Sequence, residues 1–559
     1  MDSSRSSTLQ PSSSLGGGDV EKQEVRAGKK VPIGQVHGGE ELRRQMHSRH
    51  IAMISIGGAI GTGLFVGTAN SLANGGPAGL LLGYALMGTI VFSVMVVLGE
   101  MASLLPVPGG LVTLSARFVN PTFGFLCGYW YYWALAGPAE LAASAVLISY
   151  WDDKTNPAVY ITVTGVVAAL INIGGARAYG EMEFYFASIK IITILGLIIL
   201  GIVLMSGGGP SGEVIGGMNW RDPGAFVQYL GISGSLGRFL GFWSVLTQAA
   251  YSFGGSEVVA LAAAETKNPR KAVPSAIRKV WIRIVIFYIL GVWVIGMLVP
   301  SDDPRLNLSD GTAASSPFVI AIQDAGISAL PSVINAALLT SAWSAASASL
   351  YTSSRSVYAL ALQGNAPRIF ARTNSWGLPW VSMSLNIVFL ALAYMAAGAA
   401  QAGKVFGWFS DMTAVCGLIV WGQLAYTYIR FYYGMKAQGI DRSTLPYVAP
   451  LQPWLSYYAL LMIFIILFFS DFSVFINGQW DTASFITNYL PSMLFPVVYA
   501  VVYVWKRYVR KLPRAAYANL PLSELDFVSG SRSEDDLEED GQKPKPKAAK
   551  VHSFASTLL

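Results

Sequence analysis

Long runs of apolar residues alternate with short polar connections along most of the chain. An apolar run of about 20 residues is long enough to cross a bilayer as a helix. Runs of this kind occupy residues 51–71, 78–103, 122–150, 157–175, 183–206, 238–264, 280–300, 328–357, 379–400, 404–430, 453–475 and 488–508. The pattern therefore predicts an all-α membrane protein with about 12 transmembrane helices, so that both ends of the chain lie on the same side of the membrane.

Polar residues dominate both ends of the chain. Residues 1–48 are rich in Ser, Gly and charged residues and lack the apolar stretch of a cleavable signal peptide, which predicts a disordered tail. Residues 511–559 form a second tail, in which an acidic stretch at 532–540 precedes a basic stretch at 543–550. Residues 49–510 are then expected to form one transmembrane domain.

Basic residues are concentrated in the connections on the same side as the two tails. The connections on the other side carry only a few, at Lys154, Arg221, Arg238, Arg305 and Lys404. Because the cytoplasmic connections of membrane proteins carry the excess of Lys and Arg, both termini are expected to be cytoplasmic. The sequon at Asn307 is then expected on the outside, as a candidate glycosylation site.

Composition supports the membrane assignment and narrows the chemistry. The chain is 53% hydrophobic and only 13% charged, and its net charge of +6 fits basic cytoplasmic connections. Its two cysteines lie in apolar runs and its four histidines lie in the tails or at the first membrane boundary, so neither a metal site nor a disulfide framework is expected. The sequence shows no nucleophile–base pair or phosphate-binding loop in a soluble segment. We therefore expect neither an enzyme nor a cofactor.

Glycines interrupt the first apolar run between residues 56 and 65. Gly57, Gly58, Gly61 and Gly63 are poor helix formers, and each costs about 1 kcal/mol relative to Ala. Broken backbone inside a bilayer is tolerated only where protein or a water-filled cavity surrounds it. The stretch therefore indicates a discontinuous helix around a site near the membrane midplane, with a half-helix N-terminus directed at an anion. The alternative is close helix packing, since glycines also let helices approach one another.

A second glycine break occurs five spans later, at residues 251–257. Two breaks at equivalent positions indicate five-plus-five inverted repeats with a binding site between them. Backbone N–H groups at the first break would bind a substrate carboxylate, and carbonyl groups at both breaks would bind its ammonium group, so a zwitterion fits the site. Tyr251 and Phe253 would form an aromatic lid, although core or lipid packing is the plainer reading of any single aromatic residue. The residues expected to bind substrate at the breaks are Ala59, Thr62, Gly63, Leu64, Tyr251, Phe253 and Gly254.

Several short stretches together carry a family resemblance. In chain order they are residues 49–51 leading into 60–65, then 98–102, 116–119, 263–270 and 350–355. They resemble the fungal amino-acid permeases of the amino acid–polyamine–organocation superfamily, which have the LeuT-type fold with broken first and sixth helices. The resemblance covers about residues 43–508. It implies proton-coupled import of L-amino acids across the plasma membrane by alternating access, without ATP. It also implies ubiquitin-ligase or arrestin-type adaptors at the tails and no nucleic-acid partner.

Lys190 is an ionisable residue inside the fifth predicted span, where a charge is costly and therefore marks function. Sodium-coupled relatives of the fold hold a sodium ion in the corresponding region, and related proton-coupled permeases have a lysine there. The resemblance thus implies that Lys190 replaces the cation, takes part in proton coupling and holds span five against broken span one. The alternative is a lysine that snorkels toward the cytoplasmic headgroups.

Carboxyl side chains also occur inside the predicted spans. The resemblance implies that Glu140 lies near the substrate pocket or on a proton path. An apolar cavity would disfavour its ionised form, which suits proton exchange. Glu257 follows the second break and would link substrate binding to that path. Asp411 would shape the pocket floor or contact a substrate side chain. Glu100 and Arg117, nearer the cytoplasmic side, are expected to be structural or gate residues.

The substrate range rests on weaker signals. Residues 311–322 and 437–446 resemble the dicarboxylic branch of the family, which includes glutamate and aspartate transporters, but both stretches lie outside the expected pocket. An acidic substrate would need an additional cation or donors. Ionised Glu140 and Asp411 would instead favour a cationic side chain. We therefore expect a broad range of L-amino acids, with glutamate and aspartate as the special case.

Two other functions remain open at this stage. An amino-acid-sensing receptor, or transceptor, of the same fold would signal without moving substrate. A polyamine or choline carrier would bind a ligand without a carboxylate, which would leave the anion site at Thr62 and Gly63 without a purpose. Ser347, where the family commonly has Asn, and Tyr251, where it commonly has Phe, leave the substrate range open but not the transport function.

Overall fold

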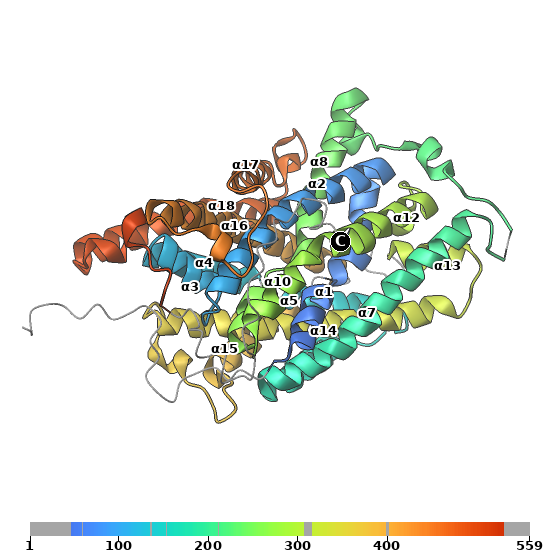
Figure 1. Ribbon diagram of the computed structural model, residues 1–559. Coiled ribbons are helices and arrows are strands. Elements are labelled where there is room, and N and C mark those ends of the chain that lie inside the picture. Colours follow the sequence, from blue (N-terminus) through green and yellow to red (C-terminus); the bar gives the residue numbers. More distant parts are fainter. Residues whose placement is uncertain are drawn as a thin grey trace, which may run out of the picture.

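The structure, a computed structural model, describes residues 46–58, 60–134, 137–152, 154–210, 212–306, 316–397 and 402–529. In these residues the chain is folded into helices, and the only strand-like pairing among them is an isolated bridge between Met46 and Thr266. Figure 1 shows α1 (Ser48–Gly57) near the middle of the packed helices. The predicted all-α class is therefore confirmed. Asn307 and most of the predicted N-terminal tail lie outside the described residues.

Helices are numbered in chain order, and η marks 3-10 and π-helical segments. The first half contains α1, η2 (Gly63–Gly67), α2 (Thr68–Leu104), α3 (Leu111–Phe118), α4 (Pro121–Ala134), α5 (Pro138–Ile148), α6 (Pro157–Ile173), α7 (Gly175–Met205), α8 (Gly234–Phe253), α9 (Val258–Ala262) and η5 (Ala263–Glu265). The second half contains α10 (Pro269–Arg278), α11 (Val280–Arg283), η6 (Ile284–Ile289), α12 (Leu290–Leu298), α13 (Pro317–Asp324), α14 (Leu330–Leu362), α15 (Trp380–Leu390), η11 (Ala391–Ala397), α16 (Ala402–Ala437), α17 (Trp454–Phe468), α18 (Thr482–Val504) and η14 (Trp505–Val509).

Many of these helices suit a membrane. By length and composition, seven helical segments of the described chain could span a bilayer: Gly63–Leu104, Gly175–Met205, Pro269–Leu298, Leu330–Leu362, Trp380–Ala397, Ala402–Ala437 and Thr482–Val509. Shorter apolar helices, Pro138–Ile148, Pro157–Ile173 and Trp454–Phe468, lie between them in the sequence. The predicted spans at 51–71, 122–150 and 238–264 are not single helices, because the backbone breaks within each of them.

One of these breaks was not expected from the sequence. The prediction of one continuous helix over residues 122–150 is wrong, because α4 ends at Ala134 and α5 begins at Pro138. Gly137, just before α5, has a φ of 86°, a left-handed conformation that glycine adopts without steric cost. Proline is well suited to the first turn of a helix because its missing N–H would have no helical partner there. This arrangement places Glu140 in the first turn of α5.

Helices pack in close pairs around α1. In the described chain α2 packs along α8, and α1 packs along α7. Small residues make these approaches possible: a Cβ on Gly83 would lie 2.6 Å from Val245 of α8, and a Cβ on Gly57 would lie 2.8 Å from the Cα of Ala187. Figure 1 shows α1 beside α7 and α2 beside α8. The glycines thus serve close packing as well as the helix breaks.

Glu100 is fully buried near the end of α2 and ties distant parts of the chain together. Arg442 donates to its carboxylate from Nε at 3.0 Å and from Nη2 at 2.8 Å. The Tyr428 hydroxyl donates at 2.8 Å and the Ala449 backbone N–H at 2.6 Å. The carboxylate joins α2 to α16 and to the segment that follows α16, so these contacts give Glu100 a structural role.

Part of the chain beyond residue 510 packs against the helices. The Leu520 N–H donates to the Val119 carbonyl at 3.1 Å, and the Gln438 side chain of α16 donates to the Leu525 carbonyl at 2.8 Å. The ring of Phe527 lies 5.3 Å from that of Phe118, centroid to centroid. Residues 513–529 therefore cover the ends of α3 and α16.

We predict that Glu100→Ala destabilises the protein, because the donors around Glu100 would lose their shared acceptor. Removing one partner of a buried ion pair costs about 3 kcal/mol or more. The matched control is Asp324→Asn, since the Asp324–Arg305 pair is exposed, with side chains 47% and 38% accessible. Such a pair contributes about 1 kcal/mol or less. Melting temperatures of the purified variants measure both effects, and equal values for Glu100→Ala and the control would contradict the structural role.

Candidate functional site

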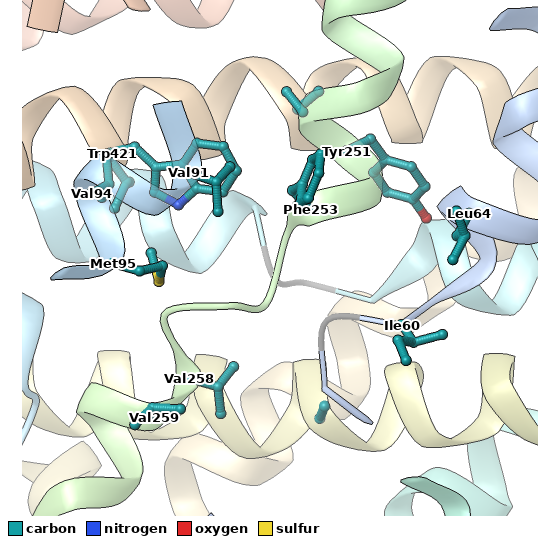
Figure 2. Packing of buried hydrophobic residues seen from close by; sticks show 14 of the residues in the cluster. Ile60, Leu64, Val91, Val94, Met95, Tyr251, Phe253, Val258, Val259 and Trp421 are labelled. Carbon is teal, nitrogen blue, oxygen red and sulfur yellow. The ribbon is translucent and has the colours of Figure 1, made fainter. Parts of the chain in front are cut away.

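Two interruptions of the helices meet in the interior of the fold. Helix α1 ends at Gly57 and helical structure resumes at η2, while α8 ends at Phe253 and α9 begins at Val258. Figure 2 shows the non-helical chain between Phe253 and Val258 together with the non-helical chain around Ile60. Both breaks that the glycines predicted are confirmed. Ala59 itself lies outside the described residues.

Close contact between the two breaks explains why glycine is needed there. Gly255 has a φ of 84°, and a Cβ on it would lie 2.7 Å from the carbonyl oxygen of Gly58. A Cβ on Gly63 would lie 2.7 Å from the Cα of Ser252 and 2.9 Å from a ring carbon of Tyr251. A side chain at either position would force the two segments apart. The breaks are therefore held against each other by backbone contact.

A cavity opens at this junction. Its walls come from both breaks, the start of α5, the middle of α14 and the middle of α16. The residues that line it are Gly58, Gly61, Gly63, Gly137, Ala139, Glu140, Ala250, Tyr251, Ser252, Gly254, Gly255, Glu257, Val258, Ala345, Ala348, Ser349, Thr352, Thr413, Gly417 and Trp421. Most of these are small, so much of the wall is backbone. Two carboxyl groups, those of Glu140 and Glu257, supply the ionisable lining.

Glu140 connects the first break to the end of α8. The Thr62 hydroxyl donates to its Oε2 at 2.9 Å, and the Tyr251 hydroxyl donates to its Oε1 at 3.0 Å. Thr62 immediately precedes η2, so the Glu140 carboxylate lies at the N-terminal end of a helix that continues into α2. The first N–H groups of a helix have no helical partner and attract an anion. Glu140, which was predicted to take part in proton coupling, therefore contacts Thr62 and Tyr251, which were predicted to bind substrate.

Lys190 lies beneath the end of α1 and is fully buried. Its ammonium group donates to the Gly57 carbonyl at 2.9 Å and to the Ser344 hydroxyl at 2.8 Å. The last carbonyls of a helix lack helical partners and favour a cation. Lys190 therefore holds α7 against the broken end of α1 and against α14. Its burial within the protein makes the snorkelling alternative wrong.

Glu183 is a buried residue of this site that sequence reasoning missed. Its carboxylate lies 3.8 Å from the Lys190 ammonium and accepts a hydrogen bond from Ser344 at 2.6 Å. Glu183 begins a predicted span, a position at which an exposed interfacial carboxylate is the ordinary expectation. The available signal was its spacing from Lys190, because seven residues make about two helical turns and place both side chains on one face.

Arg283 is a second buried residue that was missed. Its side chain is 2% exposed, and it donates to the Ser55 carbonyl near the end of α1 and to the Ser256 hydroxyl at 2.9 Å in the second break. It thereby bridges the two interruptions. Nearby, the Trp421 indole donates to Glu257 at 3.3 Å. Arg283 falls inside a predicted span, and a charged residue at such a position was the available sequence signal for a functional role.

Other predicted site residues lie away from the cavity wall. Phe253 is fully buried and stacks on Tyr288, with ring centroids 4.1 Å apart, and Leu64 is also buried. Asp411 accepts a hydrogen bond from the Gln248 side chain at 2.9 Å and is not among the lining residues. Helix α16 instead contributes Thr413, Gly417 and Trp421 to the wall. The roles expected for Phe253, Leu64 and Asp411 stay predictions.

Comparison with known proteins places the chain among permeases. The family model described as amino acid permease matches residues 50–513. The chain is 41% identical over 467 residues to the dicarboxylic amino acid permease of Saccharomyces cerevisiae, which covers 82% of this chain and 76% of that protein. It is 39% identical over 525 residues to the proline-specific permease of Emericella nidulans, covering 92% and 93%. It is 38% identical over 502 residues to the general amino-acid permease GAP1 of Saccharomyces cerevisiae, covering 88% and 81%. These identities are too close to one another to separate the different substrates in the names.

We predict that Gly57→Ala displaces the broken end of α1, because the new Cβ would overlap Ala187 of α7. Overpacking of this kind typically costs about 1–3 kcal/mol. The matched control is Gly196→Ala on α7, where the new Cβ would meet no described atom within 4 Å. Melting temperature and yield of the purified variants report the effect. A stable Gly57→Ala protein that behaves like Gly196→Ala would contradict the close approach of α1 and α7.

Proposed function

The chain belongs to the amino acid permease family, and on that premise we propose that it is a secondary transporter that imports L-amino acids. The observation that carries this proposal is the cavity between the two helix breaks, with Glu140 at the N-terminus of η2. A substrate carboxylate would bind at the backbone N–H groups of Thr62, Gly63 and Leu64, and its ammonium group at carbonyls near Ala59, Tyr251 and Gly254. Tyr251 would close over the bound substrate.

The proposal includes the wider architecture. We infer 12 spans in which the pairs α1/η2 and α8/α9 form the broken first and sixth helices of five-plus-five inverted repeats. Alternating access across the plasma membrane would move one repeat against the other around the cavity. Both termini would be cytoplasmic, with residues 1–48 as a disordered tail and residues 49–510 as the transport domain. Residues 511–559 would form a second tail, whose part beyond the packed residues 513–529 would be open to adaptors.

Proton coupling would use the buried ionisable groups of the site. Glu140 faces the cavity and is bound by Thr62 and Tyr251, so its charge state would respond directly to substrate. Lys190 holds the end of α1, and its positive charge would replace a coupling cation there. Glu257 would connect the second break to the same path. A proton imported with each zwitterion would drive accumulation without ATP.

A broad substrate range fits the lining of the cavity. Among the described lining residues there is no Lys or Arg. Arg355, which lies further along α14, is already bound to Glu265 at 2.8 Å. An acidic side chain would therefore lack a fixed cation, while Glu140 would favour neutral or basic substrates. Glutamate and aspartate are proposed as members of a broad range. The names of the relatives favour transport over the receptor and polyamine-carrier alternatives.

Uptake of radiolabelled amino acids tests this function directly. In yeast cells that lack their major amino-acid permeases, we expect faster uptake at about pH 5 than at about pH 7, because protons would be co-substrates. Free L-amino acids should compete, whereas amino-acid amides, which have no carboxylate, should not. Competition by polyamines, or no uptake with the protein at the cell surface, would contradict the proposal.

The proton-coupling role of Glu140 has its own test. Glu140→Gln keeps the size of the side chain and one acceptor oxygen, so one of the Thr62 and Tyr251 hydroxyls retains its acceptor. It removes the exchangeable proton, so uptake should lose its pH dependence. Asp324→Asn, which removes an exposed carboxylate, serves as the control and should keep the normal pH profile. The pH profile of initial uptake rates, normalised to surface expression, gives the answer. An unchanged profile in Glu140→Gln would remove Glu140 from the proton path.

A further inference from the structure

Glu183 and Lys190 form a buried pair on α7, and neither is among the residues that line the cavity. The two side chains are 1% and 0% exposed. They lie on the face of α7 that packs against α1 and α14, and Figure 1 shows α7 passing beside α1. A Cβ on Gly57 would lie 3.3 Å from Glu183 Oε1, so this carboxylate sits directly under the broken end of α1. Burying a carboxylate at this position costs free energy unless its charge is compensated by the neighbouring Lys190 ammonium.

A hydrogen-bond chain with a single direction joins the pair. Lys190 Nζ donates to the Ser344 hydroxyl at 2.8 Å, and the same hydroxyl donates to Glu183 Oε2 at 2.6 Å. Both bonds are short and both point from the ammonium to the carboxylate. A hydroxyl that accepts from one group while donating to another can pass a proton between them without moving. The direct separation of Nζ and Oε1 is longer, at 3.8 Å.

Glu183 also makes fewer hydrogen bonds than a permanently ionised buried carboxylate would need. Within the described chain, its Oε1 atom is buried and has no hydrogen-bond partner. Buried polar atoms without partners are uncommon and call for an explanation. A carboxylate that becomes protonated in part of a cycle explains this one, because the neutral acid no longer needs partners for all its lone pairs.

Glu140 is the other carboxylate that interacts electrostatically with Lys190, and its two oxygens already accept from Thr62 and Tyr251.

The remaining ionisable groups around Glu183 do not provide a better acceptor. Tyr179 on α7 stacks on Tyr351 of α14, with ring centroids 4.2 Å apart. His50 of α1 packs against Gly180 and is paired with Glu181 at 3.2 Å, nearer the start of α7. Arg355 of α14 is held by Glu265. The helices α12 and α6 bring no carboxylate to this face, since neither contains Asp or Glu.

We propose that Glu183 is the residue to which Lys190 passes the coupling proton on its way to the cytoplasmic side. The proposal rests on the proton-coupled transport proposed above and extends it to a residue below the cavity. In the step, Lys190 gives one proton to Ser344 while Ser344 gives its hydroxyl proton to Glu183. The products are a neutral amine and a neutral carboxylic acid, so the pair keeps its total charge. Glu183 lies about two turns closer than Lys190 to the start of α7, the end expected in the cytoplasm.

The transfer also connects proton movement to the broken helix. A protonated Lys190 is held by the Gly57 carbonyl and by the negative charge of Glu183. Once the proton has moved, the neutral amine holds the end of α1 less strongly, because hydrogen bonds from a charged donor are about twice as strong as neutral ones. The end of α1 would then be freer to move. Release of the proton from Glu183 would restore the ion pair with a newly protonated Lys190.

The test uses the purified full-length protein in liposomes, with a pH-sensitive dye inside and a radiolabelled L-amino acid that the wild type imports. Glu183→Gln should slow substrate-driven proton influx by about tenfold or more, since a positioned proton acceptor contributes at least that factor. Exchange of internal for external amino acid needs no net proton movement and should stay within about threefold of the wild type. Glu183→Asp should restore part of the proton influx.

Glu181→Gln is the matched control, because Glu181 is on the same helix but is partly exposed and paired with Arg49. It should leave both proton influx and exchange unchanged. Normal proton influx in Glu183→Gln would overturn the proposal. A parallel loss of influx and exchange would also overturn it, because it would show that Glu183 only holds Lys190 in place. Absence of substrate-driven proton influx in the wild type would instead overturn proton coupling itself.

Ser344→Ala provides a second variant if Glu183→Gln does not fold. It removes the bridging hydroxyl while both charged groups remain, so it should slow proton influx and preserve exchange. Proton influx equal to that of the wild type in Ser344→Ala would contradict transfer through the hydroxyl.

Discussion

Inside a bilayer every backbone polar group needs a partner within the protein, and two helix breaks leave such groups unpaired at the centre of this fold. Buried charged side chains supply the partners. Lys190 donates to the Gly57 carbonyl and Arg283 to the Ser55 carbonyl, both at the end of α1. Glu140 accepts from the Thr62 hydroxyl and lies next to the first N–H groups of η2. The signs follow the helix dipole, with cations at the C-terminal end and an anion at the N-terminal end. Without these contacts, the backbone groups at the breaks would lose buried partners and the breaks would be less stable.

Three of the cations inside the fold have a carboxylate partner, and an uncompensated charge in the interior is more costly than a paired one. Lys190 is paired with Glu183, Arg355 with Glu265 at 2.8 Å and Arg442 with Glu100 at 2.8 Å. The pairs differ in geometry. Glu265 and Glu100 each accept more than one bond from their arginine. Glu183 instead accepts from Ser344, and its other oxygen, 3.8 Å from the Lys190 ammonium, has no hydrogen-bond partner within the described chain. The first two arrangements suit fixed structure, and the third suits a group whose charge changes.

The sequence predicted the helical class and both central breaks because glycine clusters inside apolar runs are local signals. It also marked Glu140 and Lys190, since a charge within a span is visible without a structure. It did not predict the break at Gly137, where a single Gly-Pro pair carries the signal. It missed Glu183 and Arg283, whose importance depends on partners far away in the chain, Ser344 for one and Ser55 for the other. For Asp411 the sequence showed the position in a span but not the direction of the side chain. Whether it lines the cavity depends on the rotation of α16 about its axis, and an apolar pattern on all sides of a helix does not reveal that rotation.

The cavity wall explains how such a fold can keep one mode of recognition while its substrates vary. Around the breaks the wall is mostly backbone and small residues, and groups of this kind recognise what all amino acids share, the carboxylate and the ammonium. The side chain of a substrate would meet other elements, above all α14 and α16, at Ala348, Thr413 and Gly417. A few substitutions there would change the space and polarity offered to a side chain without disturbing the breaks. Overall sequence identity averages over hundreds of positions and so carries little information about these few. In the proposed transporter, local chemistry on two helices would decide the substrate range, while the charged contacts that hold the broken backbone would maintain the framework.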